Sequence, residues 1–276
     1  MKCAFVLGFL GLLSLGALRA EPQIDLSAKP LIKRFTNDEW RIWTSPFRKS
    51  SYSSRAFAKY IVPFTLVTGA LVATDRRTAD ILPNTKSQTN WSLRASQVGA
   101  PYTLAGVAAA TYLVGMATKN RKARETGFIG AEAIAHSQLV TLGLKAITQR
   151  ERPLEARISG NGGTGFFRGG DSFPSGHASG SFALATVFAY EYGHDHRWVP
   201  FASYGLAGVV AASRMSGDRH YVSDLFTGST VGFLIGRYLY KSHHDAGLDG
   251  QLPKRAERRM PQIAVSAHGG TLAWKW

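Results

Sequence analysis

The feature that most constrains the fold of this chain is a series of six apolar stretches separated by short breaks. They lie near residues 60–74, 95–118, 127–145, 176–192, 198–213 and 221–240. Each stretch is long enough for a helix, and the breaks between them carry Pro, Gly or charged residues. None shows the alternation of apolar and polar residues that is typical of strands. We therefore predict an all-α bundle of six helices.

The apolar stretches are weak candidates for membrane spans. Stretch 95–118 alone has more than 20 consecutive residues without Asp, Glu, Lys or Arg. The others are shorter, rich in Ala, Gly and Thr, or interrupted by charge, as by Glu132 and Arg237. The mean hydropathy of −0.09 is also low for a protein with six spans. These features favour a soluble or peripherally bound domain over an integral membrane protein.

The charge of the chain indicates an anionic partner. Lys and Arg together number 33 against 18 Asp and Glu, which gives a formal net charge of +15. Such an excess of positive charge favours phosphate, nucleic acid or acidic lipid as a ligand. Cys3 is the one cysteine in the sequence, and this excludes a disulfide scaffold.

The N-terminus has the pattern of an export signal. A basic start at Lys2 is followed by an uncharged apolar run over residues 3–18, and Ala20 precedes Glu21. This pattern predicts a cleavable signal peptide over residues 1–20, with an uncleaved membrane anchor as the alternative. We therefore expect export to the cell envelope, in the periplasm, with peripheral or integral membrane association.

Residues 21–59 form a polar and aromatic N-terminal arm before the predicted helical domain, which we place at residues 60–242. Thr36 and Glu39 fit a capping box and predict a short helix that starts at Thr36. The arm is interpreted as packed on the domain rather than as a strip that docks on a membrane surface.

Residues 243–276 form the C-terminal tail, which differs in pattern from the domain. A basic linker leads to two short alternating segments around Gly269-Gly270, and this pattern predicts a β-hairpin. Two adjacent histidines, His243 and His244, stand at the start of the linker, and we do not interpret them as a metal site.

Three short motifs carry residues with catalytic chemistry, and each lies at an end of a predicted helix. The first runs from Lys145 to Arg152-Pro153, the second is Pro174-Ser175-Gly176-His177, and the third runs from Ser213-Arg214 through His220 to Asp224.

Together the motifs meet the requirements of phosphoryl transfer. A transferring phosphoryl group needs preorganised cations and donors, which Lys145, Arg152 and Arg214 supply. Ser175 and Gly176 add a hydroxyl and backbone N–H groups at a helix N-terminus. A helix that carries both His220 and Asp224, four residues apart, would place the carboxylate beside the imidazole and leave the other ring nitrogen free to attack. His177 is placed to protonate the leaving group. The set requires no metal, and we predict no cofactor.

The three motifs resemble the signature of the type 2 phosphatidic acid phosphatase superfamily, which also contains bacterial class A acid phosphatases and vanadium-dependent haloperoxidases. That signature is Lys-x6-Arg-Pro, Pro-Ser-Gly-His and Ser-Arg-x5-His-x3-Asp, and every position matches over about residues 60–240. The resemblance implies that His220 is a nucleophile forming a phosphohistidine, that Asp224 positions it, and that His177 is the general acid. It also implies that phosphate is bound by Lys145, Arg152, Ser175, Gly176 and Arg214.

We therefore expect a metal-independent phosphatase that hydrolyses phosphomonoesters or lipid (pyro)phosphates. A vanadate-dependent haloperoxidase, with vanadate as its cofactor, is the first alternative, and a non-catalytic module that binds anionic lipid or nucleic acid is the second. The expected partners are a phosphate-containing small molecule or lipid as substrate and an anionic membrane surface. Nucleic acid is not expected.

Overall fold

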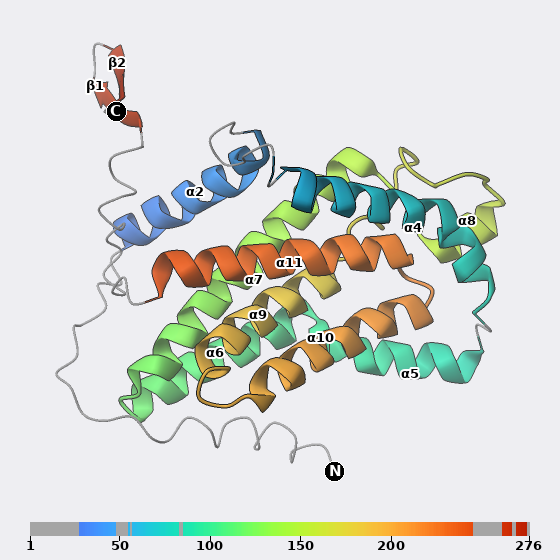
Figure 1. Ribbon diagram of the computed structural model, residues 1–276, viewed down its shortest axis with the longest axis horizontal. Helices are drawn as coiled ribbons and strands as arrows, with labels where there is room; N and C mark the ends of the chain where they lie inside the picture. Colours follow the sequence, from blue (N-terminus) through green and yellow to red (C-terminus); the bar gives the residue numbers. More distant parts are fainter. Residues whose placement is uncertain are drawn as a thin grey trace.

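The computed structural model describes residues 28–47, 55, 57–82, 85–244, 261–266 and 269–274. Its body is a bundle of helices, so the all-α prediction is confirmed (Figure 1). The predicted signal peptide, residues 1–20, lies outside the described residues.

The central helix of the bundle is α9 (Gly176–Tyr192), and most of its residues are buried. It packs against α7 (Arg121–Thr148), α10 (Trp198–Ser216) and α11 (Val222–His243). Outside these, α4 (Val62–Asp80) lies on α11, α6 (Pro101–Ala117) on α7, and α5 (Lys86–Ser96) on α10.

Glycines on α11 allow it to approach α9 closely. A Cβ atom at Gly232 would lie 2.0 Å from the backbone oxygen of Ser179, and one at Gly228 would lie 2.5 Å from that of Ser175. A real Cβ never comes so near an oxygen, so only glycine permits this distance between the two helices. The close approach holds the start of α9 against the start of α11, where two of the three motifs lie.

Six helices of the bundle overlap the six apolar stretches, but the predicted count of six is too low. Helix α5 was not predicted, because its sequence KSQTNWSLRAS is polar and shows no apolar repeat. The seven-residue α8 (Pro153–Ser159) was also missed, since it is too short to show a helical pattern. Short turns of 3-10 helix occur at Ser45–Phe47 and Gln97–Gly99, and a π-helical turn at Phe57–Ile61 leads into α4.

The N-terminal helix α2 spans Ala28–Thr44 and lies against α7. Its predicted start at Thr36 is wrong, because the Thr36 hydroxyl donates to the backbone oxygen of Ile32 (3.0 Å) inside the helix. Polar contacts attach α2 to the bundle. Arg34 pairs with Glu132, Glu39 bonds to Nδ1 of His136 (2.8 Å), and Asp38 bonds to Nε2 of His243 (2.7 Å).

His243 therefore does not belong to a linker, as the sequence pattern indicated. It stands at the last position of α11 and is buried against Asp38 of α2. Further along the tail, β1 (Pro261–Ser266) and β2 (Gly269–Trp274) pair antiparallel, with Pro261 opposite Trp274.

Two helical segments in the described part of the chain are long and apolar enough to cross a membrane, by length and composition. They are Phe57–Asp80 and Lys86–Ala117. The apolar window of the first is not buried against the described residues, and one third (33%) of the second is buried. Leu66 on α4 and Leu113 on α6 are among the exposed apolar side chains of these segments. The sequence pattern had indicated the second segment alone.

Candidate active site

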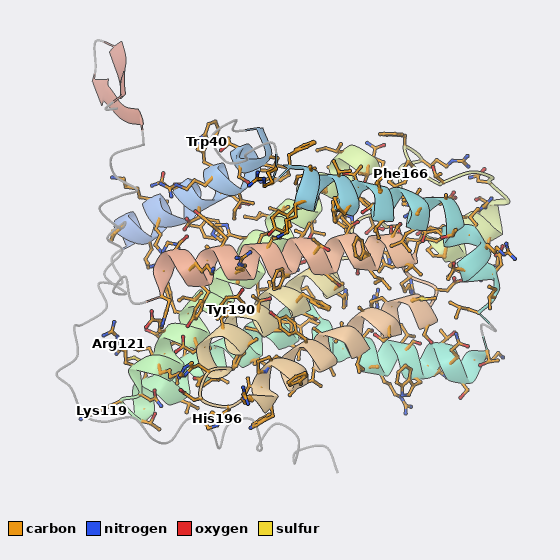
Figure 2. All side chains as sticks on the ribbon, viewed as in Figure 1. Trp40, Lys119, Arg121, Phe166, Tyr190 and His196 are labelled. Carbon is orange, nitrogen blue, oxygen red and sulfur yellow. The ribbon has the colours of Figure 1, made fainter. Side chains whose placement is uncertain are left out.

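The three predicted motifs meet at one end of the bundle. The C-terminal ends of α7 and α10 and the N-terminal ends of α9 and α11 all lie there, next to α8 (Figure 1). Lys119, Arg121 and His196 mark the opposite end (Figure 2). The eight predicted site residues are therefore brought together from four helices and the turns beside them.

His220 lies just before α11, at the turn that leads into the helix, rather than inside it. It is 3% exposed, and its Nδ1 lies 2.8 Å from the backbone oxygen of Ser172. A carbonyl oxygen only accepts hydrogen bonds, so Nδ1 carries the proton and the Nε2 lone pair of the neutral ring is free. The sequence predicted that one helix carries both His220 and Asp224, and this is wrong because His220 precedes α11. The backbone oxygen of Ser172, which comes from another segment, sets the tautomer of the ring.

Asp224 lies beside this ring, with Oδ2 at 3.5 Å from Nδ1 of His220. The same oxygen accepts from the backbone N–H of Tyr221 (2.8 Å) and from the Ser172 hydroxyl. Burial alone would raise the pKa of Asp224. Hydrogen bonding to His220 and the nearby Arg150 charge outweigh burial, so the pKa of this carboxyl is below its usual value. Asp224 is therefore an ionised partner for the imidazole.

Two of the predicted phosphate-binding cations share one carboxylate, that of Asp171. Nε and Nη2 of Arg152, the N-cap residue of α8, lie 2.6 and 2.8 Å from the two Asp171 oxygens. Nζ of Lys145, in the last turn of α7, lies 3.6 Å from Oδ2. A two-point grip on two oxygens is also how Arg holds phosphate. The Asp171 carboxylate thus binds Arg152 and Lys145 as a phosphate group would. Asp171 lies outside the three sequence motifs.

Arg214 stands in the last turn of α10 and is 8% exposed. Its Nε is buried without a hydrogen-bond partner in the described part of the chain. Burial first, and then the charges of Arg152 and Arg219, lower the pKa of Arg214 to about 10. A buried guanidinium close to other cations attracts an anion, because burial is costly for a charge that lacks an opposite partner.

Ser175 is the N-cap residue of α9, and Gly176 is the first residue of that helix. The backbone N–H of Ser175 donates to the backbone oxygen of Asp224 (3.0 Å), which ties the second motif to the third. The Ser175 hydroxyl accepts from Ala178 N at 3.5 Å, so its own proton is available to an anion. Nε2 of Gln138 donates to the Gly176 oxygen (3.0 Å) and fixes the start of α9.

His177 follows in the first turn of α9 and is half-buried. Burial lowers its pKa to about 3, and the charges of Arg214, His220, Lys145 and Arg152 act in the same direction. These groups affect one another only because they lie close together. The structure therefore places His177 next to the cations, and in this state its ring is neutral at pH 7.

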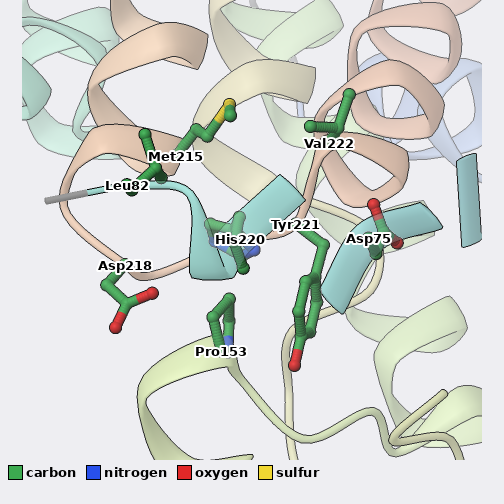
Figure 3. A pocket seen from close by; sticks show the side chains of 9 residues that line it. Asp75, Leu82, Pro153, Met215, Asp218, His220, Tyr221 and Val222 are labelled. Atoms are coloured by element: carbon green, nitrogen blue, oxygen red, sulfur yellow. The ribbon is translucent and has the colours of Figure 1, made fainter. Parts of the chain in front are cut away.

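A small pocket lies beside His220 (Figure 3). Its lining is drawn from three segments of the chain and consists of Asp75, Ala79, Leu82, Pro153, Met215, Asp218, His220, Tyr221 and Val222. Within the described part of the chain, no group of three or more His, Cys, Asp or Glu side chains is arranged to hold a metal ion.

Sequence reasoning missed three residues that contact the predicted ones, Arg150, Asp171 and Ser172. It also missed Asp75, which is linked to Asp224 through Arg150. Arg150 lies in the spacer of the first motif, and Asp171 and Ser172 lie just before the second, so proximity to a motif was the available signal. Asp75 had no such signal, because it lies in the apolar helix α4, far from every motif along the chain.

Comparisons with known proteins match this region. Residues 126–248 match the family model described as the PAP2 superfamily. The lipid A 1-phosphatase of Porphyromonas gingivalis is 33% identical over 105 residues, which are 36% of this chain and 24% of that protein. The match thus spans about a quarter of the length of this curated relative.

A solved structure shares the fold. It is the crystal structure of the first transmembrane PAP2 type phosphatidylglycerolphosphate phosphatase from Bacillus subtilis, with a TM-score of 0.50 and 21% sequence identity. The superposition covers 65% of this chain and 94% of that chain.

Proposed function

Because residues 126–248 match the family model of the PAP2 superfamily, we propose that this protein is a phosphatase of lipid phosphate monoesters. The observation that carries the proposal is the convergence of Lys145, Arg152 and Arg214 around two histidines. One of them, His220, has its Nδ1 proton held by a carbonyl and its Nε2 free, as a nucleophile requires.

In the first step, the cations and the Ser175 hydroxyl bind the phosphoryl oxygens in place of Asp171. Nε2 of His220 attacks phosphorus, the ester P–O bond breaks, and the leaving alkoxide takes a proton from His177. The Asp224 carboxylate stabilises the positive charge that develops on the His220 ring. The products of this step are an alcohol and a phosphohistidine.

In the second step, the neutral His177 ring accepts a proton from water as the water oxygen attacks phosphorus. The N–P bond breaks, and inorganic phosphate leaves with its oxygens still held by the cations until release. Both steps are completed by side chains of this chain, so we expect turnover that does not require a metal ion.

The role of His177 as an acid depends on bound phosphate. The low pKa of His177 arises from burial and from surrounding positive charge. A phosphate group with two negative charges offsets the positive charge and raises the affinity of the ring for a proton. Substrate binding therefore favours protonation of His177, which then donates this proton to the leaving group.

A lipid phosphate is the substrate class that the molecule favours. The apolar window of Phe57–Asp80 is not covered by described residues, and such a surface fits the acyl chains of a bilayer. The names of both similar proteins denote phosphatases of lipid phosphates. We infer membrane association in the cell envelope, with the expected export signal directing the chain there.

The test measures phosphate release in EDTA from phosphatidic acid in mixed micelles and from p-nitrophenyl phosphate. We expect release from both substrates, with phosphatidic acid preferred, and complete loss in the His220→Ala variant. His196→Ala, at the opposite end of the bundle, is the matched control and is expected to keep full activity (Figure 2). Normal turnover by folded His220→Ala protein would contradict the mechanism.

A further inference from the structure

Arg150 is the largest side chain in the described part of the chain that is fully buried, at 1% exposure. It lies between two buried carboxylates. Its Nη1 is 2.6 Å from Oδ1 of Asp224, and its Nη2 is 2.8 Å from Oδ2 of Asp75. Asp224 belongs to the candidate active site, whereas Asp75 comes from α4.

We propose that Asp75 and Arg150 are positioning residues, which hold the Asp224 carboxylate in the orientation that His220 needs. This inference rests on the proposed function. It makes α4 part of the catalytic machinery, although Asp75 lies outside the region 126–248 that matches the family model.

The first argument concerns the two oxygens of Asp224. Arg150 donates to Oδ1. Oδ2 faces His220 and accepts from the Ser172 hydroxyl and the Tyr221 backbone N–H. Because each oxygen has separate partners, the carboxylate cannot rotate about its bond without losing several hydrogen bonds at once. The oxygen that faces His220 is therefore fixed by the bond that Arg150 makes on the other side.

The second argument concerns Arg150 itself, which is held in place on every side. Its guanidinium carbon lies 4.3 Å from the centre of the Tyr221 ring and 4.6 Å from that of Phe166. Its Nε donates to the backbone oxygen of Thr164 (3.0 Å). Asp75 completes this set, because Nη2 would otherwise lose its carboxylate partner in a buried place, where an unpaired donor is costly.

The third argument concerns the start of α11. Oδ1 of Asp75 accepts the backbone N–H of Ser223 (3.1 Å), and the Ser223 hydroxyl, which donates to Asp75, accepts from Nη1 of Arg150 (2.7 Å). Asp75 thus satisfies one of the N–H groups that a helix start leaves without a partner. Since His220 immediately precedes this start, α4 also fixes the position of the nucleophile.

Asp75, Arg150 and Asp224 together carry one more negative charge than positive charge. Two carboxylates surround one guanidinium, and this surplus lies on the side of His220 where Nδ1–H points. Such a surplus favours the positive charge that the imidazole gains when Nε2 bonds to phosphorus. Figure 3 shows Asp75 and His220 lining the same pocket.

Other charged groups also face His220, and they must stay unchanged for a test of Asp75 to be clean. They come from α7, the turn before α9, α9, α10 and α11, and comprise Lys145, Asp171, His177, Arg214 and Asp224. The Asp75→Asn substitution touches none of them directly, and its amide oxygen still accepts the Ser223 N–H.

We expect Asp75→Asn to lower kcat about 10- to 100-fold while KM changes less than about twofold, as for other groups that orient a histidine through its partner. Loss of a negative charge near His220 lowers the pKa of the imidazole. The acid limb of the kcat/KM profile should therefore move to lower pH. Arg150→Met should lower kcat similarly, and Arg150→Lys, which keeps the charge, should restore part of it.

The matched control is Glu132→Gln, which breaks the buried pair with Arg34 between α7 and α2, away from the site. It should lower Tm as Asp75→Asn does, yet leave kcat and the pH profile unchanged. If Asp75→Asn and Arg150→Lys lower Tm but keep wild-type kcat and pH profile, the positioning role is wrong. Should Asp75→Asn fail to fold, Arg150→Lys decides by the same criteria.

A second measurement does not depend on turnover. The ¹⁵N NMR signals of the His220 ring report which nitrogen carries the proton, and we expect Nδ1–H in the wild type and a changed signal in Asp75→Asn. If the His220 signal changes in Asp75→Asn but the wild type hydrolyses no phosphate ester, the proposed function is overturned and the positioning role is supported. If the wild type is active but the His220 signals are unchanged in Asp75→Asn and Arg150→Lys, the positioning role is wrong and the proposed function stands.

Discussion

At the residue scale, the positive charges of the site determine the protonation state of His177. Burial and the neighbouring groups Arg214, His220, Lys145 and Arg152 lower its pKa to about 3. An anion that binds among these cations reverses part of that shift, so the pKa of His177 is higher in the bound state than in the free state. The ring is therefore neutral before substrate binds, and we expect its affinity for a proton to rise once the phosphate is bound.

This coupling predicts proton uptake when the protein binds inorganic phosphate. Because the bound-state pKa is the higher one, the contribution of His177 to affinity should be complete below its free-state pKa of about 3 and be lost as pH rises through the bound-state pKa. Calorimetry in buffers of different ionisation enthalpy measures the number of protons taken up. His177→Gln is the control, since it retains only the protonation change of phosphate itself. Equal uptake by both proteins would show that His177 does not gain a proton.

At the element scale, the distance between α9 and α11 decides whether the motifs meet. Gly228 and Gly232 remove the side chains that would separate the two helices. At the end of this contact the Ser175 N–H donates to the Asp224 backbone oxygen (3.0 Å). The contact between helices and the geometry of the site are thus linked through one hydrogen bond.

Gly232→Ala should therefore destabilise the fold and reduce activity. Its Cβ would lie 2.0 Å from the Ser179 backbone oxygen, and forced overpacking of this kind costs about 1–3 kcal/mol. Gly205→Ala on α10 is the matched control, because a Cβ there has no heavy atom within 4 Å. Alanine at this exposed helix position should stabilise the fold by about 0.5–1 kcal/mol. Thermal unfolding and phosphate release measure both effects. Equal Tm values for the two variants would contradict the role of the close approach.

At the scale of the whole molecule, polar and apolar surfaces are divided between different helices. The site end carries the cations, while α4 and α6 expose apolar side chains such as Leu66 and Leu113. The N-terminal helix α2 is attached by buried polar contacts to α7 and α11. This division fits a protein whose helices contact lipid and whose helix ends contact a phosphate head group.

The full chain should therefore stay with lipid vesicles when salt is raised to about 1 M, where the Debye length is only about 3 Å. Burial of apolar surface does not weaken under these conditions, whereas attraction between the basic chain and anionic lipid does. Flotation of the protein with vesicles measures this. Release by salt would instead support the peripheral attachment that the low mean hydropathy indicated.

The sequence by itself determined the helical class, the positions of the main helices and the eight residues that the site brings together. It did so because helix formation depends on local patterns, and because three motifs resembled one family at every position. Only the tertiary structure decided which atoms those residues use. The tautomer of His220 is set by Ser172, and Asp224 is oriented by Arg150 and Asp75. The contact between Ser223 and Asp75 joins residues 148 positions apart. No local pattern records such a pair, because the packing of α4 on α11 creates it.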